Sequence, residues 1–377
     1  VGAGPLEEVG ERGGPRGQVG GHPDVDARLA AAQAEAAAVV ARDVVLSNIE
    51  DFESEEYAGR IVDLLYPTTL IADAAVVDGR GGPAFAADVR IDGERIAAVG
   101  ELEPAPGEPV VDGRGLVLSP GFIDAHSHAD DAILELRDAE AAVNQGITTV
   151  VVGQDGESKR PLADFFARLE AAPAAINVAS YAGHGTLRTE VMGEDSTRAA
   201  TSAEVERMEV LLEEEMAAGA LGLSTGLEYD PGIYSTTEEV VALARVAAAH
   251  GGRYISHVRS EDRRFWEAVD EILTIGREAG LPVQITHVKL AMRSLHGQAD
   301  RLLALLDEAR AAGVEVTADL YPYTYWQSTL MSVFPGRDLS DLGAAQFVAD
   351  ELSSPEEMLI PFFAPDPRLA GKTVAEI

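Results

Sequence analysis

The sequence predicts an α/β protein in which a TIM-like (β/α)8 barrel follows a small β unit. Short apolar runs alternate with helical stretches, which is typical of parallel βαβ units. Seven such runs follow residue 120: 121–126, 148–153, 177–183, 219–225, 253–258, 283–288 and 314–321. A complete barrel needs eight strands and about 250 residues. A doubly wound sheet is the alternative, but no Gly-x-Gly-x-x-Gly follows the first run, which disfavours a dinucleotide site.

The elements before the barrel differ in composition. Residues 1–24 contain eight glycines and little apolar periodicity, so we expect disorder there. Residues 27–45 are rich in alanine and predict a helix, which an acidic connection at 50–56 follows. Three apolar runs broken by Asp-Gly or Gly then predict short strands and tight turns in a compact β unit: 69–79, 87–100 and 109–121.

Two barrel helices have clear start signals. The tetrapeptides Thr201–Glu204 and Ser235–Glu238 both fit a capping box, in which a hydroxyl and a glutamate satisfy the first backbone amides. The second helix is expected to run to His250 and to end at Gly251, because glycine readily adopts the conformation that terminates a helix.

The composition excludes several classes of function. The chain carries 64 acidic and 29 basic residues, a net charge of −35, which argues against nucleic-acid and anionic membrane partners. It has no cysteine, so disulfides, thiolate metal sites and cysteine nucleophiles are excluded. No apolar run is long enough for a transmembrane helix, and residues 1–24 do not resemble a signal peptide. We therefore expect a cytoplasmic protein that acts on a small molecule.

Four of the eight histidines fall at the ends of predicted strands. His126 and His128 follow the first run, His257 ends the fifth and His287 ends the sixth. Residues at i and i+2 of a strand point to the same side, and the carboxyl ends of parallel barrel strands meet at one rim. Imidazole is the commonest protein ligand of zinc-like metals. The pattern therefore predicts a metal site at this rim.

Carboxylates at the same rim are further candidates. Asp124 precedes the histidine pair, Asp155 follows the second strand and Asp319 ends the seventh. An aspartate could bridge two metal ions, although Asp155 in an Asp-Gly sequence could equally be a turn residue. His184 could face the rim or bond to backbone in its glycine-rich turn. The remaining histidines are assigned no role: His22, His250 and His296.

Six motifs in this order carry a family resemblance: FIDAHSHAD (122–130), YAGHGTLR (181–188), GALGLSTGLEYDPGIYS (219–235), ISHVRSE (255–261), ITHVK (285–289) and DLYPYT (319–324). They resemble the N-acyl-D-amino-acid deacylases, or D-aminoacylases, of the amidohydrolase superfamily. The resemblance covers about residues 69–377 and leaves the first 65 residues outside it.

The resemblance implies a metal-dependent barrel with a small β-sandwich attached. It divides the chain into four parts: an N-terminal extension over 1–65, the first part of the β-sandwich over 66–119, barrel strands one to seven over 120–330, and the start of an insertion over 331–377. The eighth strand, and the family's catalytic aspartate at its end, do not occur before Ile377. We therefore expect a barrel truncated before strand eight, in a fragment of a longer protein that holds no assignable catalytic residue.

The resemblance also implies one or two zinc ions. His257 and His287 would be tight ligands, and His126 and His128 would serve a second, weaker site. The family usually bridges the two sites with a cysteine, and Asp155 occupies that position here, with Glu157 as the alternative.

Substrate-binding positions follow from the same motifs. Lys289, Tyr321 and Ser328 match them, and His184 is added as the fourth candidate. Lys289 is one of only three lysines, with Lys159 and Lys372, and it lies two residues past a strand-end histidine. A cation there could hold a substrate carboxylate.

The function implied is metal-dependent hydrolysis of the amide bond of N-acyl-D-amino acids. A hydantoinase-like or dihydroorotase-like cyclic amide hydrolase is one alternative. Those enzymes usually bridge their metals with a carboxylated lysine, and Lys159 lies too far along the chain for that role. The other alternative is an inactive fragment, because an incomplete barrel exposes strand edges.

Overall fold

A computed structural model of the protein describes residues 44–47, 60–61, 68–93 and 95–377. These residues form two compact units. The first draws on the described residues up to 125 and on 129–151 and 168–179, and the second on 126–128, 152–167 and 180–377. The predicted disorder at 1–24 and the acidic connection at 50–56 lie outside the described residues. So does the predicted helix over 27–45, except for its last two positions, which begin strand β1.

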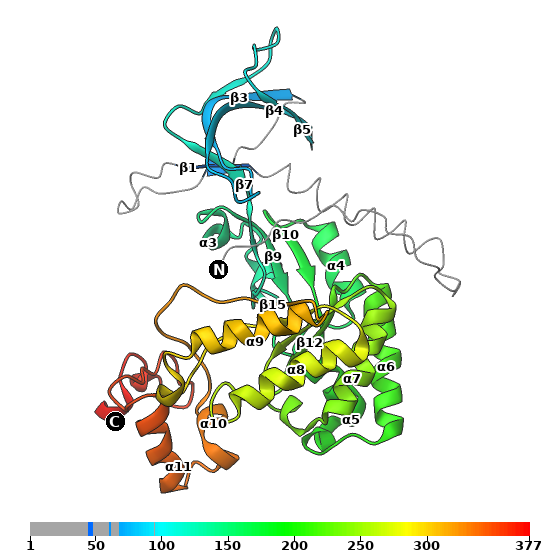
Figure 1. The fold of residues 1–377 in the computed structure, drawn as a ribbon, viewed down its shortest axis with the longest axis vertical. Helices are drawn as coiled ribbons and strands as arrows, with labels where there is room; N and C mark the ends of the chain where they lie inside the picture. The colour runs from blue at the N-terminus through cyan, green and yellow to red at the C-terminus, as the bar shows by residue number, and fades with distance from the viewer. Residues whose placement is uncertain (1–43, 48–59, 62–67, 94) are drawn as a thin grey trace. The chain divides into compact units, whose positions relative to one another are not determined.

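The first unit contains the predicted β unit. Its seven-stranded sheet has the order β2-β1-β7-β3-β4-β5, with β6 also paired to β3 (Figure 1). The strands are β1 (Val44–Ser47), β2 (Arg60–Ile61), β3 (Thr68–Val76), β4 (Phe85–Asp92), β5 (Arg95–Gly100), β6 (Val110–Asp112) and β7 (Val117–Pro120). Alternate apolar side chains of β3 and β4, among them Ile71, Val89 and Ile91, pack with Leu118 of β7 into a small core. The three predicted apolar runs are thereby confirmed as strands.

Three further strands form a second sheet with the order β10-β9-β8. They are β8 (Phe122–Asp124), β9 (Ile147–Val152) and β10 (Asn177–Ser180), and β8 pairs parallel to β9. The short helices α2 (Ala132–Glu135) and α3 (Glu140–Val143) lie between β8 and β9 in the chain, and α4 (Leu162–Ala171) follows β9.

The second unit is built on five parallel strands in chain order, β11-β12-β13-β14-β15. They are β11 (Ala182–Gly183), β12 (Gly222–Gly226), β13 (Arg253–His257), β14 (Val283–Ile285) and β15 (Val316–Ala318). The connecting helices are α5 (His184–Met192), α6 (Ser202–Ala217), α7 (Thr237–Ala249), α8 (Phe265–Ala279) and α9 (Ala299–Ala311). Helix α7 packs on β12 and β13, α8 on β14, and α9 on β15.

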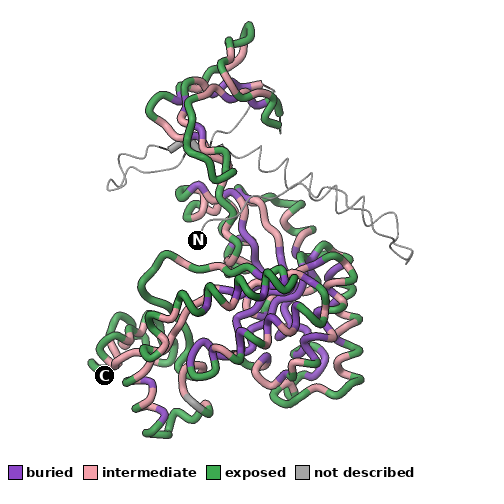
Figure 2. Tube along the Cα trace, in the orientation of Figure 1, coloured by how far each residue is buried: buried purple, intermediate pink, exposed green. Residues whose placement is uncertain are grey.

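Burial follows the same plan. All five residues of β12 and the last four of β13 are buried, and Figure 2 shows the buried residues gathered along these strands. Strands that are buried along their whole length are typical of parallel sheets that helices cover. Each of the seven predicted runs contains a strand, and the third is divided into β10 and β11 around Tyr181. The strand–helix alternation is therefore confirmed.

One of the two predicted helix starts is confirmed and one is wrong by a residue. Thr201 caps α6 with the full capping box, in which Glu204 Oε2 accepts from the Thr201 amide at 2.7 Å. Helix α7 is capped by Thr236, whose hydroxyl accepts from the Glu239 amide at 3.2 Å. Ser235 is buried and donates to the Gly232 carbonyl at 2.6 Å, so its hydroxyl is directed away from the helix. The end of α7 at His250 and Gly251 is as expected.

The chain after β15 forms short helices, including α10 (Leu330–Val333) and α11 (Leu342–Phe347). Over residues 319–377 the pairing is limited to an isolated antiparallel bridge between Leu359 and Thr373. Within the described ranges, no helix combines the length and the apolar character needed to cross a membrane.

Candidate metal centre

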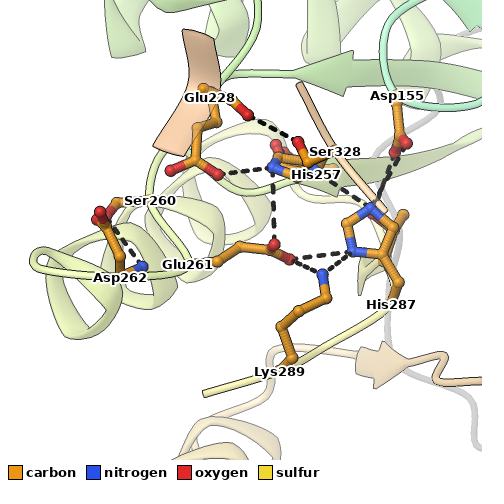
Figure 3. A network of polar contacts seen from close by, with 12 residues as sticks. Asp155, Glu228, His257, Ser260, Glu261, Asp262, His287, Lys289 and Ser328 are labelled. Carbon is orange, nitrogen blue, oxygen red and sulfur yellow. Dashed lines mark hydrogen bonds and ion pairs between the residues drawn. The ribbon is translucent and has the colours of Figure 1, made fainter. Parts of the chain in front are cut away.

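The predicted metal-binding residues come together in the second unit. Asp155 Oδ2 lies 3.6 Å from His126 Nε2, 3.3 Å from His128 Nε2 and 3.4 Å from His287 Nε2. His257 Nδ1 lies 2.9 Å from His287 Nε2. Figure 3 shows Asp155, His257 and His287 converging on one another. Residues that are up to 161 positions apart in the numbering, from His126 to His287, therefore surround one point.

These five residues form two overlapping groups of potential ligands that share Asp155. One group is His126, His128 and Asp155, and the other is Asp155, His257 and His287; within each group the ligand atoms lie within 4.8 Å of one another. A carboxylate oxygen that faces several imidazole nitrogens suits zinc and similar divalent ions, which take nitrogen and oxygen ligands in such arrangements. The residues present therefore fit one or two ions of this class.

The backbone that presents Asp155 is tightly enclosed. Asp155 has a φ of +53°, a left-handed conformation that aspartate tolerates better than most residues. The next residue, Gly156, accepts a hydrogen bond from the Thr186 amide at 3.2 Å and donates one to Ser224 Oγ at 3.3 Å. A Cβ atom on Gly226 of β12 would lie 2.1 Å from the Asp155 carbonyl oxygen. Neighbouring elements, rather than Asp155 itself, thus fix this turn.

Asp155 stands in a tight turn, as one interpretation of the sequence expects, and its side chain also faces three histidines. Glu157, the alternative ligand, is exposed and belongs to neither group. Asp124 lies in β8, in the first unit, and is also outside both groups.

A second layer of carboxylates surrounds the imidazoles. His126 Nδ1 lies 3.4 Å from Asp319 Oδ1, His257 Nε2 lies 2.9 Å from Glu228 Oε2, and His287 Nδ1 lies 3.0 Å from Glu261 Oε1. Each of these imidazoles thus directs one nitrogen to the shared centre and the other to a carboxylate. Metal-binding histidines characteristically have such a partner, which fixes the orientation of the ring. Glu228, His257 and Glu261 also form a third group of potential ligands, but this hydrogen-bonding arrangement accounts for them without an ion.

Sequence reasoning missed Glu228 and Glu261. Glu228 stands two residues after β12, and Glu261 stands four residues after His257. Both lie inside motifs that carry the family resemblance, and their place in those motifs is the feature of the sequence that could have identified them. Asp319 was a candidate, and the structure places it beside His126 while its Oδ1 also accepts from the His287 amide at 2.5 Å.

The predicted substrate-binding residues lie beside this centre. Lys289 Nζ donates to Glu261 Oε1 at 2.5 Å and lies 5.8 Å from the centre of the Tyr321 ring. Ser328 hydrogen-bonds Tyr229, whose ring centre lies 4.3 Å from that of His257. The structure therefore brings Lys289, Tyr321 and Ser328 to the centre, with the lysine charge already paired.

Residues 109–350, more than half of the chain, match the amidohydrolase family. The chain belongs to this family. The D-aminoacylase of Alcaligenes xylosoxydans xylosoxydans is 37% identical over 331 residues, which cover 82% of this chain and 64% of that protein. The N-acyl-D-glutamate deacylase of the same organism is 39% identical and covers 80% and 63%. This amidohydrolase chain therefore spans a little under two thirds of the length of these relatives.

Solved structures agree with this assignment. The N-acyl-D-glutamate deacylase from Bordetella bronchiseptica, complexed with zinc and a phosphonate mimic of the tetrahedral intermediate, superposes with a TM-score of 0.73 at 34% identity. A crystal structure of D-aminoacylase superposes with a TM-score of 0.70 at 34% identity. Each match covers 82% of this chain and 66% of the other. The predicted resemblance and the barrel fold are confirmed, and the doubly wound alternative is wrong.

His184 has a different place in this amidohydrolase from the one predicted. Its side chain is fully buried at the start of α5, and its Nε2 lies 2.9 Å from Glu239 Oε1. Arg188, also fully buried, donates to the same carboxylate oxygen and to the carbonyls of Ser196 and Arg198. The substrate-binding prediction for His184 is therefore wrong: the side chain contacts a buried ion pair and has no exposed surface for a ligand.

Neighbouring carboxylates at the centre raise the pKa values of two histidines, His126 and His287. Burial by itself lowers the pKa of His126, but hydrogen bonds and charges from Asp155 and Asp319 outweigh it and raise this pKa to about 9. Burial likewise lowers the pKa of His287, and Asp155 and Glu261 raise it to about 9. The pKa of Asp155 lies far below its usual range, because hydrogen bonds from three histidines outweigh the effect of burial.

These shifts predict how stability depends on pH when metal is removed. The folded-state pKa of His126 and His287 exceeds the unfolded value near 6.5, so their stabilising contribution is full below pH 6.5 and is lost as pH rises through about 9. We expect the melting temperature of chelator-treated protein to fall between pH 6.5 and 9.5. Protein loaded with a divalent metal ion should not show this fall, because the bound metal would replace the protons. A melting temperature of the metal-free protein that stays constant or rises over this pH range would contradict the raised pKa values of His126 and His287.

Proposed function

We propose that the protein to which this chain belongs hydrolyses the amide bond of N-acyl-D-amino acids, releasing a carboxylate and a free D-amino acid. We propose His126, His128, Asp155, His257 and His287 as ligands of one or two zinc ions. The proposal depends on one observation above all: Asp155 Oδ2 faces three imidazole nitrogens at 3.3–3.6 Å. The four relatives named above are D-aminoacylases or N-acyl-D-glutamate deacylases, and one of them is a zinc complex, which supports the choice of reaction and metal.

The bound metal would supply Lewis-acid chemistry, lowering the pKa of water and polarising the scissile carbonyl. The residues of this chain would position the metal ligands and the substrate. Asp319, Glu228 and Glu261 hold the three imidazoles in position through their second nitrogens. Burial of His257 restricts water on that side of the centre.

Substrate orientation is the proposed role of Lys289, Tyr321 and Ser328. Lys289 would bind the carboxylate of the amino acid, sharing its charge with Glu261. Tyr321 lies under the lysine ammonium and remains a phenol, because burial and the charge of Glu261 raise its pKa to about 12. It can therefore donate a hydrogen bond to the substrate at neutral pH.

Cyclic amide hydrolysis is the second candidate, and the site offers a direct test of it. Asp155 is the residue that the two ligand groups share, at the position where hydantoinases usually have a carboxylated lysine. A panel of N-acyl-D-amino acids, N-acyl-L-amino acids and cyclic ureides would separate the candidates. Turnover of only the ureides would overturn the deacylase proposal, and turnover of none by a metal-loaded protein would favour the inactive alternative.

Removal of His257 or His287 tests the metal centre itself. We expect His257→Ala and His287→Ala each to lose zinc and to lower kcat by at least about 100-fold, since first ligands matter more than the outer residues that cost 10- to 100-fold. Chelation of the unaltered protein should abolish activity, and added zinc should restore it.

The matched control is His250→Ala, which removes a histidine at the end of α7. His250 Nε2 lies 2.5 Å from Glu213 Oε2, and His250 belongs to none of the groups of potential ligands. It should keep both zinc content and rate. Full activity in the two ligand variants, or after chelation, would show that the centre is not catalytic.

Two predictions from the sequence stay proposals. The domain boundaries at residues 66, 120 and 331 are proposed from the family motifs, and the cytoplasmic location expected from the sequence is likewise a proposal.

A further inference from the structure

Glu261 occupies an unusual position between a proposed metal ligand and a proposed substrate-binding cation. Its carboxylate is buried, and one oxygen, Oε1, lies 3.0 Å from His287 Nδ1 and 2.5 Å from Lys289 Nζ. Lys289 Nζ itself lies 3.0 Å from the same His287 nitrogen. Figure 3 shows these three groups forming a closed triangle of contacts.

The loop that carries Glu261 is held firmly in place. Ser260 Oγ donates to Asp262 Oδ1 at 2.5 Å and accepts from the Arg264 amide at 3.1 Å. The Glu261 carbonyl accepts from the Ala291 amide at 3.1 Å, which joins this loop to the one after β14. The carboxylate is therefore aimed at His287 and Lys289 by backbone on both sides.

The triangle contains two donors, His287 Nδ1 and Lys289 Nζ, that share one acceptor, Glu261 Oε1. His287 Nε2 is the atom that faces Asp155 and His257, so a metal at this centre takes that nitrogen. A neutral imidazole that gives Nε2 to a metal carries its proton on Nδ1, where it is a donor. The ammonium of Lys289 is also a donor only. The two can lie 3.0 Å apart because Glu261 Oε1 accepts from both.

Without the Glu261 carboxylate, the hydrogen bonding between Lys289 and His287 would change. Lys289 would donate to the lone pair of His287 Nδ1, and the imidazole proton would move to Nε2, the nitrogen needed by the metal. We infer that Glu261 is a positioning residue that keeps His287 in its metal-binding tautomer against competition from Lys289. This inference rests on the proposed metal centre, and it predicts that the effect of losing Glu261 depends on whether Lys289 is present.

A double-mutant cycle on zinc affinity tests the inference. Zinc would be titrated into the metal-free full-length protein against a competing chelator, with the visible spectrum of bound cobalt as a second readout. We expect Glu261→Ala to weaken zinc binding by about 10- to 100-fold. Lys289→Met alone should leave the affinity within about threefold, and the double variant should bind about tenfold more tightly than Glu261→Ala, since the competing donor is gone.

Control variants distinguish a failure of the inference about Glu261 from misfolding and from a failure of the proposed metal centre. Glu271→Ala removes another shielded carboxylate, which pairs with Arg259 at 2.8 Å, and should leave zinc affinity unchanged. Glu261→Gln keeps the volume of the side chain and gives a second cycle with Lys289→Met if the alanine variant does not fold. An unchanged affinity in Glu261→Ala, or a double variant as weak as it, would overturn the inference. Zinc binding by His287→Ala equal to that of the unaltered protein would instead overturn the metal centre.

Discussion

Asp155→Asn is expected to lose metal and activity together, with zinc affinity and kcat/KM each falling by at least about 100-fold. Asparagine has the same size and tolerates the left-handed backbone at this position, where φ is +53°. The change therefore removes charge and leaves the turn intact. What it removes is the anionic oxygen that faces His126, His128 and His287.

Asp155→Cys is the informative partner of that variant. A thiolate offers one anionic donor from the same turn, so we expect zinc affinity to return to within about tenfold of the unaltered protein. Glu157→Gln, an exposed change two residues away, should alter neither metal content nor rate. Both quantities can be measured on one preparation by metal analysis and by hydrolysis of an N-acyl-D-amino acid. Activity that survives in Asp155→Asn would exclude a ligand role for this residue.

Glu239→Ala is expected to cause the largest loss of stability, about 3–5 kcal/mol in the free energy of unfolding. The change leaves the guanidinium of Arg188 buried without its carboxylate, next to the buried His184. Arg188 keeps its hydrogen bonds to two backbone carbonyls, but these do not replace a countercharge. Urea denaturation followed by circular dichroism would measure the effect.

A more exposed pair provides the comparison. Glu213 lies 2.5 Å from His250; Glu213 is exposed to solvent and His250 is half-buried. Glu213→Ala should therefore cost no more than about 1 kcal/mol. Equal losses in the two variants would show that burial of the Arg188–Glu239 pair does not govern its contribution.

The strands could be predicted from the sequence because their signal is local. Each barrel strand lies in a short run of mostly uncharged residues bounded by glycine or charge, and the burial of β12 and β13 explains why their interior positions are uncharged. The strand-end histidines were found for the same reason, since parallel strands bring their carboxyl ends to one edge. Helix starts were less secure: Ser235 and Thr236 both have a hydroxyl that could cap α7, and the local hydrogen bond from Ser235 to the Gly232 carbonyl leaves Thr236 as the cap.

The second layer of the centre could not be found this way. The chain has 64 acidic residues, most of which a solvated surface would explain, so Glu228 and Glu261 do not stand out. His184 was misassigned because its partner, Glu239, lies 55 residues away and belongs to a different helix. Burial of a charged group depends on such distant partners, and periodicity does not report them.

The glycines around Asp155 bear on which metals the protein could be made to accept. Because Gly156 and Gly226 fix the turn, the side chain at position 155 can change while its Cβ atom stays in place. An oxygen donor there favours hard ions such as manganese, whereas a sulfur donor favours softer ones. A single substitution at position 155 is therefore a route to changing the metal selectivity of the centre while the rest of the barrel stays the same.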